Sequence, residues 1–259
     1  MKTDDRPTAA VMAHLRAPLR RLGALATGVL LLLDGSAAAA QQAPPDAPHA
    51  RPGEACGGSQ DWPYLCRYRD QNAAILRSDV RPQVVFLGDS ITEYWRLAQP
   101  DLFGDKIVDR GISGQTTPQI LLRFYADVVA LHPRVVHIMA GTNDIAGNTG
   151  PTSDDQIFDN IRAMLDIARA NHIKVVLASI TPAAAGDAAH PATRILAINA
   201  RLRQLAAQRG AIFVDYHTAL SDEHNGIRPA LANDGLHPNR DGYAVMRPLA
   251  ERALAEALR

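Results

Sequence analysis

The sequence predicts an α/β fold in which a parallel sheet of five strands carries helices on both of its faces. Two observations support this prediction. Short apolar runs rich in β-branched residues are bounded by Gly, Pro or polar residues, which is typical of parallel strands buried on both sides. Stretches with apolar residues at helical spacing separate these runs, and such an alternation builds a parallel sheet covered by helices.

The five predicted strands are short and spread along most of the chain. The first ends at Gly88 and the third runs up to Gly141, a residue type that lets the chain turn sharply. In chain order the strands are residues 83–87, 106–108, 135–139, 174–178 and 211–214.

Four helices are predicted between and after these strands, and three of them have recognisable ends. Pro118 suits a first helical turn, Ser153 with Gln156 fits a capping box, and Gly210 is placed as a C-terminal stop. The predicted helices are residues 116–130, 154–171, 193–209 and 242–258.

Composition and charge narrow the class of protein. The chain has 259 residues with 27 acidic and 27 basic side chains, so its formal charge is zero. This balance gives no support for a nucleic-acid partner, which normally leaves a basic face, or for a charge-driven membrane partner. Apolar residues make up 47% of the chain, enough for a sizeable core.

The N-terminus is typical of a secretory signal peptide. Arg16, Arg20 and Arg21 precede an apolar run at residues 22–33, and an Ala-rich cleavage region follows at 37–40. The alternative is a membrane anchor, but the run is short against the ~20 residues that a spanning helix needs, and Asp34 ends it. We expect residues 1–40 to be the signal peptide, no stable membrane insertion, and export to a periplasm or the medium.

Residues 41–55, rich in Pro, Ala and Gln, are predicted to be a flexible linker. Cys56 and Cys66 are the only cysteines. In an exported protein they are expected to form a disulfide that closes a small loop, with two free thiols as the alternative. With no second core-sized segment, residues 56–259 are expected to form one catalytic domain.

Ser90 is the candidate nucleophile. It follows the first predicted strand in the block Gly88-Asp89-Ser90. A serine hydroxyl is a weak nucleophile that needs an adjacent base, so this role depends on the other blocks described next. Taken alone, Ser90 would be interpreted as an ordinary helix N-cap.

His237 is the candidate base and Asp234 the candidate carboxylate. They lie three residues apart, and this spacing lets the carboxylate hold the ring N–H that faces away from the nucleophile. His217 and His224 are weaker rivals as base, and Asp215 is the rival carboxylate.

Gly114 and Asn143 are the candidate oxyanion hole, together with the backbone N–H of Ser90. A glycine N–H approaches a carbonyl unobstructed, and an asparagine amide is a neutral donor. The structural alternatives are a loop glycine with positive φ and an Asx turn. All these residues follow predicted strands, and the carboxyl ends of parallel strands meet at one edge, where ligands bind.

These blocks resemble those of the SGNH hydrolase superfamily, also called GDSL esterases. The family's Ser, Gly, Asn and His match Ser90, Gly114, Asn143 and His237. The similarity spans residues 82–249, with matching blocks Gly88-Asp89-Ser90-Ile91-Thr92, Gly141-Thr142-Asn143-Asp144 and Asp234-Gly235-Leu236-His237-Pro238. The resemblance implies a flavodoxin-like three-layer α/β/α sandwich, no metal or other cofactor, and hydrolysis through an acyl-enzyme.

The expected function is an exported carboxylic-ester hydrolase that removes short acyl groups, with acetylated carbohydrate as the favoured substrate. The alternatives are a lysophospholipase or thioesterase for long acyl chains, a polysaccharide O-acetyltransferase, and a non-catalytic carbohydrate-binding module. The stretch 181–191 is expected either to line the acyl or leaving-group side or to be a plain surface loop. Tyr94 and Trp95 are expected either to face the substrate or to pack on the sheet.

Overall fold

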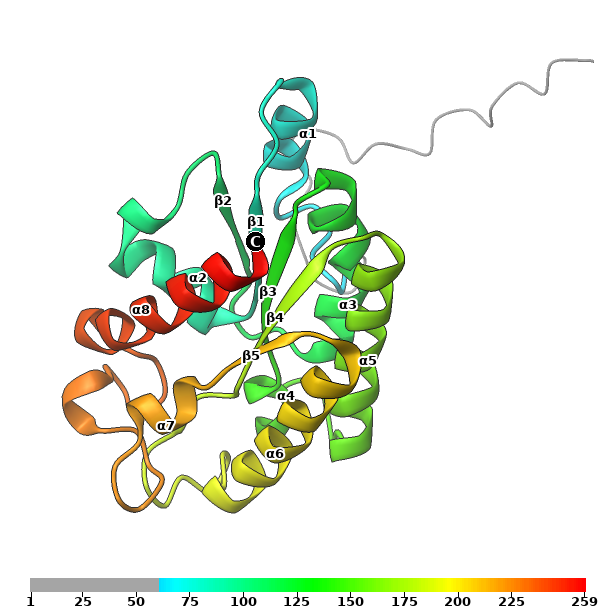
Figure 1. The fold of residues 1–259 in the computed structure, drawn as a ribbon. Helices are drawn as coiled ribbons and strands as arrows, with labels where there is room; N and C mark the ends of the chain where they lie inside the picture. Colours follow the sequence, from blue (N-terminus) through cyan, green and yellow to red (C-terminus); the bar gives the residue numbers. More distant parts are fainter. Residues whose placement is uncertain (1–60) are drawn as a thin grey trace, which may run out of the picture. The chain divides into compact units, whose positions relative to one another are not determined.

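The computed structural model describes residues 61–259, which form a five-stranded sheet with helices on both faces (Figure 1). All the strands are parallel, in the order β2-β1-β3-β4-β5. This is the flavodoxin-like order, so the predicted fold class is confirmed. The strands are β1 Val84–Gly88, β2 Ile107–Gly111, β3 Val135–Met139, β4 Lys174–Ala178 and β5 Ile212–Val214.

The helices form the two outer layers of the fold. One layer contains α3, α5 and α6, and the other contains α2, α7 and α8. The bounds are α1 Arg69–Arg77, α2 Ser90–Ala98, α3 Thr117–Asp127, α4 Thr142–Ala146, α5 Asp154–Ala170, α6 Ala192–Arg209, α7 Tyr216–Leu220 and α8 Arg240–Ala257, with 3₁₀ turns at Pro100–Leu102, Val129–Leu131 and Pro229–Leu231.

Successive residues of β1 supply the two cores between these layers. Val85 and Leu87 pack with α3, α5 and α6, whereas Val84 and Phe86 pack with α2, α7 and α8. Side chains of a strand alternate between its two faces, and both faces here are covered. This double burial explains why β1 is a continuous apolar run rather than an alternating one.

The four predicted helices are present, and their ends differ from the prediction for local reasons. The capping box of Ser153 and Gln156 starts α5, and Gly210 ends α6 with φ of 67°. The helix α8 begins two residues earlier than predicted, because the Asn239 side chain accepts hydrogen bonds from the backbone N–H groups of Asp241 and Gly242. The helix α3 ends at Asp127, where the chain tightens into a 3₁₀ turn.

Within residues 61–259, no helix combines the length and apolar character that crossing a membrane requires. The predicted signal peptide, linker and Cys56 lie outside the described residues. The signal peptide, the cleavage site and the Cys56–Cys66 disulfide therefore remain predictions from the sequence.

Candidate active site

Ser90 lies where β1 gives way to α2. Asp89 is the N-cap of α2, and its carboxylate accepts a hydrogen bond from the Ile91 N–H at 3.0 Å. Ser90 is therefore the first residue of the helix, and the interpretation of Ser90 as the N-cap is wrong. A Cβ at Gly88 would lie 2.5 Å from the Met139 carbonyl oxygen, so the sharp exit from the strand requires glycine there.

His237 reaches Ser90 from a loop 147 residues further along the chain. The Ser90 Oγ lies 2.9 Å from His237 Nε2, and His237 Nδ1 lies 2.7 Å from Asp234 Oδ2. The other carboxylate oxygen, Oδ1, accepts hydrogen bonds from the backbone N–H groups of His237 at 2.8 Å and Leu236 at 3.0 Å. Asp234 thus holds both the ring and the backbone of the loop.

The carboxyl group of Asp234 is charged under ordinary conditions. Partial burial works to raise its pKa, but the hydrogen bonds from the backbone and ring of His237 and from the Leu236 N–H outweigh it and lower the pKa to about 2. A charged carboxylate at Nδ1 keeps the proton on that nitrogen and leaves Nε2 free to accept one.

The stretch 181–191 packs against the loop that contains Asp234 and His237. The Ala184 N–H donates to the Gly235 carbonyl at 2.6 Å. Gly235 has φ of 81°, and a Cβ there would lie 2.9 Å from the Ala184 methyl group. The stretch therefore supports the turn between the two residues.

The rival residues have other partners. Asp215 caps α7 and pairs with Arg203 at 2.5 Å. The Nδ1 of His217 lies 3.2 Å from Ser221 Oγ, and burial lowers the His217 pKa. His224 is exposed beside Glu223. None of the three makes a hydrogen bond to Ser90 within the part of the chain that the structure describes.

Gly114 and Asn143 lie in the loops after β2 and β3. The Gly114 N–H makes no hydrogen bond to any of residues 61–259, and Gly114 has φ of 78°. Asn143 is 7% exposed; its amide donates one hydrogen bond to the Gln115 carbonyl at 3.0 Å and accepts one from Asn148 at 2.8 Å. Because an amide NH₂ has two protons, one remains for a further acceptor.

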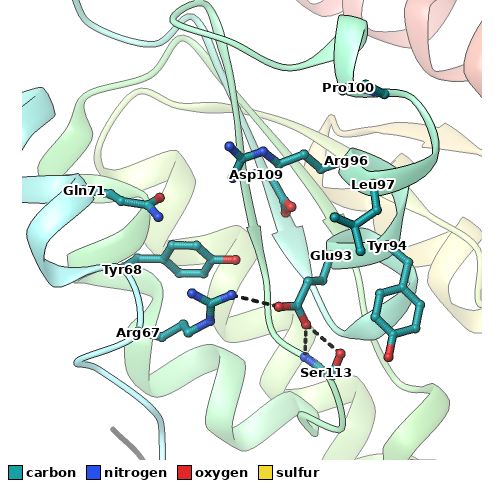
Figure 2. Close-up of a pocket in the computed structure, with 10 residues that line it drawn as sticks. All are labelled: Arg67, Tyr68, Gln71, Glu93, Tyr94, Arg96, Leu97, Pro100, Asp109 and Ser113. Carbon is teal, nitrogen blue, oxygen red and sulfur yellow. Dashed lines mark hydrogen bonds and ion pairs between the residues drawn. The ribbon is translucent and has the colours of Figure 1, made fainter.

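The loop that contains Gly114 is held by Glu93, which lies one turn after Ser90 in α2. Glu93 accepts hydrogen bonds from the backbone and side chain of Ser113 at 2.8 and 2.6 Å, and from Arg67 at 3.0 Å (Figure 2). One carboxylate thus ties the nucleophile helix to the residue beside Gly114.

Arg123 also holds the loop that contains Gly114. It is fully buried in α3 and donates to the Gly88 carbonyl at 2.7 Å, to Gln115 at 2.6 Å and to Asp127 at 3.0 Å. Sequence reasoning missed Glu93 and Arg123. For Arg123 the available signal was a charged residue inside the apolar face of a predicted helix.

The two aromatic residues after Ser90 have different environments. Trp95 is fully buried, stacked on Tyr243 and edge-on to Phe86. Tyr94 is 38% exposed, and its ring centroid lies 5.2 Å from that of His237. Packing on the sheet is therefore confirmed for Trp95, whereas Tyr94 borders the candidate site.

Asp89 makes the stability of the protein depend on pH. It is buried, its second carboxylate oxygen has no partner within residues 61–259, and burial raises its pKa from 3.8 to about 7. Between those two values the folded state holds a proton that the unfolded state releases. The free energy of unfolding therefore falls as pH rises from about 4 to 7 and levels off above.

We expect the free energy of unfolding to depend less on pH in the Asp89→Asn variant than in the wild type. Between pH 5 and 7 the free energy of unfolding should decrease less than in the wild type, by on the order of 2 kcal/mol. Some decrease should remain, because burial also raises the pKa of Asp109 to about 7. Urea denaturation at each pH measures it, with the exposed Asp79→Asn variant as the control. An identical pH dependence of stability in Asp89→Asn and wild type would show that Asp89 is not its cause.

Within the described part of the chain, no cluster of three or more His, Cys, Asp or Glu side chains is arranged to hold a metal ion.

The fold and the sequence together define the class of protein. The model of the GDSL-like lipase/acylhydrolase family matches residues 86–245, so the chain belongs to that family and is an ester-hydrolysing enzyme. The resemblance to SGNH hydrolases is thereby confirmed.

Particular relatives agree with this assignment. An acetylxylan esterase from Geobacillus stearothermophilus is 26% identical over an alignment of 201 residues, which covers 63% of this chain and 90% of the relative. A solved structure from Bacteroides fragilis NCTC 9343 is 43% identical with a TM-score of 0.71, covering 77% of this chain and 99% of that one. A GDSL-like lipase structure from Bacteroides thetaiotaomicron VPI-5482 is 39% identical with a TM-score of 0.70, covering 75% and 98%.

Proposed function

We propose that this protein is an exported serine esterase that removes short acyl groups, above all acetyl, from carbohydrate esters. The observation that carries the proposal is the continuous hydrogen-bonded chain from Ser90 Oγ through His237 to Asp234. The predicted signal peptide supports export. The similarity to an acetylxylan esterase supports an acetylated carbohydrate as the substrate.

In the proposed mechanism Ser90 Oγ attacks the ester carbonyl while His237 Nε2 takes the hydroxyl proton. Asp234 stabilises the imidazolium that forms. The negative charge on the carbonyl oxygen is held by the N–H groups of Gly114 and Ser90 and by the free amide proton of Asn143.

The tetrahedral intermediate then breaks down to an acyl-enzyme. The bond to the alcohol oxygen breaks, His237 gives its proton to that oxygen, and the acyl group stays on Ser90 as an ester. A water molecule, deprotonated by His237, attacks this ester and releases the acid and the free Ser90 hydroxyl. In an O-acetyltransferase a sugar hydroxyl takes the place of this water.

The test is a series of aryl esters of rising acyl length. We expect kcat/KM to be highest at acetyl and to fall with each added methylene. A rate that rises with chain length would replace the proposal by a lysophospholipase or thioesterase function. Acetyl transfer to an added oligosaccharide, in place of release to water, would replace it by the transferase.

We expect Asp234→Asn to lower kcat by about 10²-fold with little change in KM. The amide keeps one oxygen for the Leu236 and His237 backbone but presents an N–H to His237 Nδ1, which favours the wrong tautomer. The Asp234 side chain is 57% exposed, so water can partly replace the carboxylate and the loss stays below that of the nucleophile.

Steady-state kinetics on an aryl acetate measure this effect. Asp222→Asn is the control, because Asp222 also accepts backbone hydrogen bonds in a loop, from His224 and Gly226, away from Ser90. Full activity of Asp234→Asn would remove Asp234 from the mechanism.

A further inference from the structure

A cavity of about 770 Å³ opens beside the candidate active site, between α2, β2 and the segment that leads into α1 (Figure 2). Two of its lining residues adjoin the proposed machinery. Tyr94 lies with its ring 5.2 Å from the His237 ring, and Ser113 directly precedes Gly114. The cavity is thus a neighbour of the reacting groups, and Ser90 and His237 are not part of its lining.

The position of the cavity identifies the part of the substrate that it faces. In ester cleavage the carbonyl oxygen points to the oxyanion donors, and the leaving oxygen must approach the base that protonates it. Here that base is His237, and Tyr94 both lies beside the His237 ring and lines the cavity. The alcohol part of the ester therefore extends past Tyr94 toward the cavity.

Several polar groups of the cavity have no hydrogen-bond or ion-pair partner among residues 61–259. Arg96 forms no ion pair within residues 61–259, and the Gln71 amide makes no hydrogen bond there. Asp109 is 5% exposed; one of its oxygens accepts from the Gly111 N–H at 2.7 Å, and the other is unpartnered among the described residues. In contrast, Arg67 and Glu93 are paired with each other at 3.0 Å.

These unpartnered groups fit a neutral, hydroxyl-rich ring. A guanidinium and an amide NH₂ donate hydrogen bonds and a carboxylate accepts them, and a sugar hydroxyl can do both. Burial raises the pKa of Asp109 to about 7, so above that pH Arg96 and Asp109 carry opposite charges, and Arg67 is paired with Glu93. The lining then has no excess of either charge. The exposed face of Tyr94 offers an amphipathic surface at the entrance. A long acyl chain would instead require a continuous apolar lining.

We propose that this cavity is the subsite for the alcohol part of the ester and that it binds a neutral sugar ring through Arg96, Asp109 and Tyr94. This inference rests on the proposed function, because it takes His237 as the base. It adds to that function the place and the residues of carbohydrate recognition.

The test compares two acetate esters in a pH-stat assay. One is an acetylated xylo-oligosaccharide, and the other is ethyl acetate, whose two-carbon alcohol is short against the roughly 9 Å along the helix axis from Ser90 to Arg96. For Arg96→Ala we expect kcat/KM on the sugar ester to fall about 10-fold, mostly through KM, and kcat/KM on ethyl acetate to stay within about 2-fold. Arg162→Ala, an exposed arginine of α5, is the matched control and should change neither.

A second measurement uses no sugar ester. The deacetylated xylo-oligosaccharide should inhibit ethyl acetate hydrolysis competitively, and its inhibition constant should rise about 10-fold in Arg96→Ala. The Asp109→Asn variant, which keeps an oxygen for the Gly111 N–H, should weaken this inhibition as well.

The outcomes separate the two proposals. If the wild type hydrolyses neither ester, the proposed function fails. The subsite proposal fails, and the esterase proposal stands, if the wild type hydrolyses both esters but Arg96→Ala changes neither kcat/KM on the sugar ester nor the inhibition constant. The same conclusion follows if Arg96→Ala lowers kcat/KM equally on both esters.

Discussion

Replacing Ser90 by alanine is expected to lower kcat on short-chain esters by about 10⁴-fold or more while the fold is retained. The change removes the only atom that lies in hydrogen-bond contact with His237 Nε2 among the described residues. The Ser113 hydroxyl is not free to substitute, because its Oγ donates a hydrogen bond to Glu93 at 2.6 Å. What remains is attack by water, helped by the oxyanion donors.

The matched control is Ser78→Ala. Ser78 also bonds through its hydroxyl, but to carbonyls at the exposed end of α1, and its loss should leave kcat unchanged. Denaturation curves of both variants show whether the fold is kept. Near wild-type turnover by a folded Ser90→Ala protein would overturn the acyl-enzyme mechanism.

The same experiment extends to His237. Residues that act as one unit lose their effect together, so the double variant Ser90→Ala/His237→Ala should be no slower than Ser90→Ala alone. A double variant whose loss equals the product of the two single losses would show that the residues act independently. Such a result would contradict the hydrogen-bonded chain as a functional unit.

The fold was predictable because its strands are buried on both faces. The strand Val84–Gly88 is buried at every position and has no polar side chain, so it stands out from the helical periods around it. The strand β2 shows the limit of this reasoning. It continues past the predicted end at Val108 through Asp109 and Arg110, two charged residues outside the predicted strand.

Tertiary partners explain why those charges are tolerated inside a strand. Arg110 is buried because its guanidinium donates to Asn72 at 2.9 Å and lies over the Tyr68 ring. Asp109 is held by the Gly111 N–H. Both Asn72 and Tyr68 come from the segment around α1, far away in the chain, so no local sequence pattern predicts these contacts.

Four helices escaped the sequence analysis for a simpler reason. The helices α4 and α7 have five residues each and α1 and α2 nine, too few for a repeated apolar period to be recognised. Two of the four, α2 and α4, begin with or include the proposed site residues Ser90 and Asn143. The motifs therefore gave the proposed site residues without showing that Ser90 and Asn143 lie in the first turns of helices.

The sequence predicted the residues of the candidate site, but it did not predict the residues that hold them in place. Motif order and a parallel sheet were enough to bring Ser90 and His237 to one edge. The contacts of Glu93 with Ser113 and of Arg123 with the Gly88 carbonyl depend on how α2 and α3 pack. Such contacts between side chains and backbone carry no spacing rule, so the structure was needed to find them.

Asn143→Ala is expected to lower kcat by about 10²–10³-fold with little change in KM. The amide has one proton bonded to the Gln115 carbonyl at 3.0 Å, and its other proton is available to the oxygen that becomes negative in the transition state. A neutral ground-state carbonyl gains far less from this donor, so the loss should fall on kcat.

The same substitution also breaks structural hydrogen bonds, and a control must separate the two effects. Asn199 is equally buried, at 8% exposure, and its amide also makes two hydrogen bonds, to the backbone of Ile180 at 2.8 and 2.9 Å. Asn199→Ala should therefore be destabilised to a similar degree while keeping its kcat. If both variants lose stability and kcat in parallel, Asn143 acts only by holding the loop. If only Asn143→Ala loses kcat, and a phosphonate ester that mimics the tetrahedral intermediate reacts with Ser90 correspondingly more slowly in that variant, the Asn143 amide acts on the oxyanion itself.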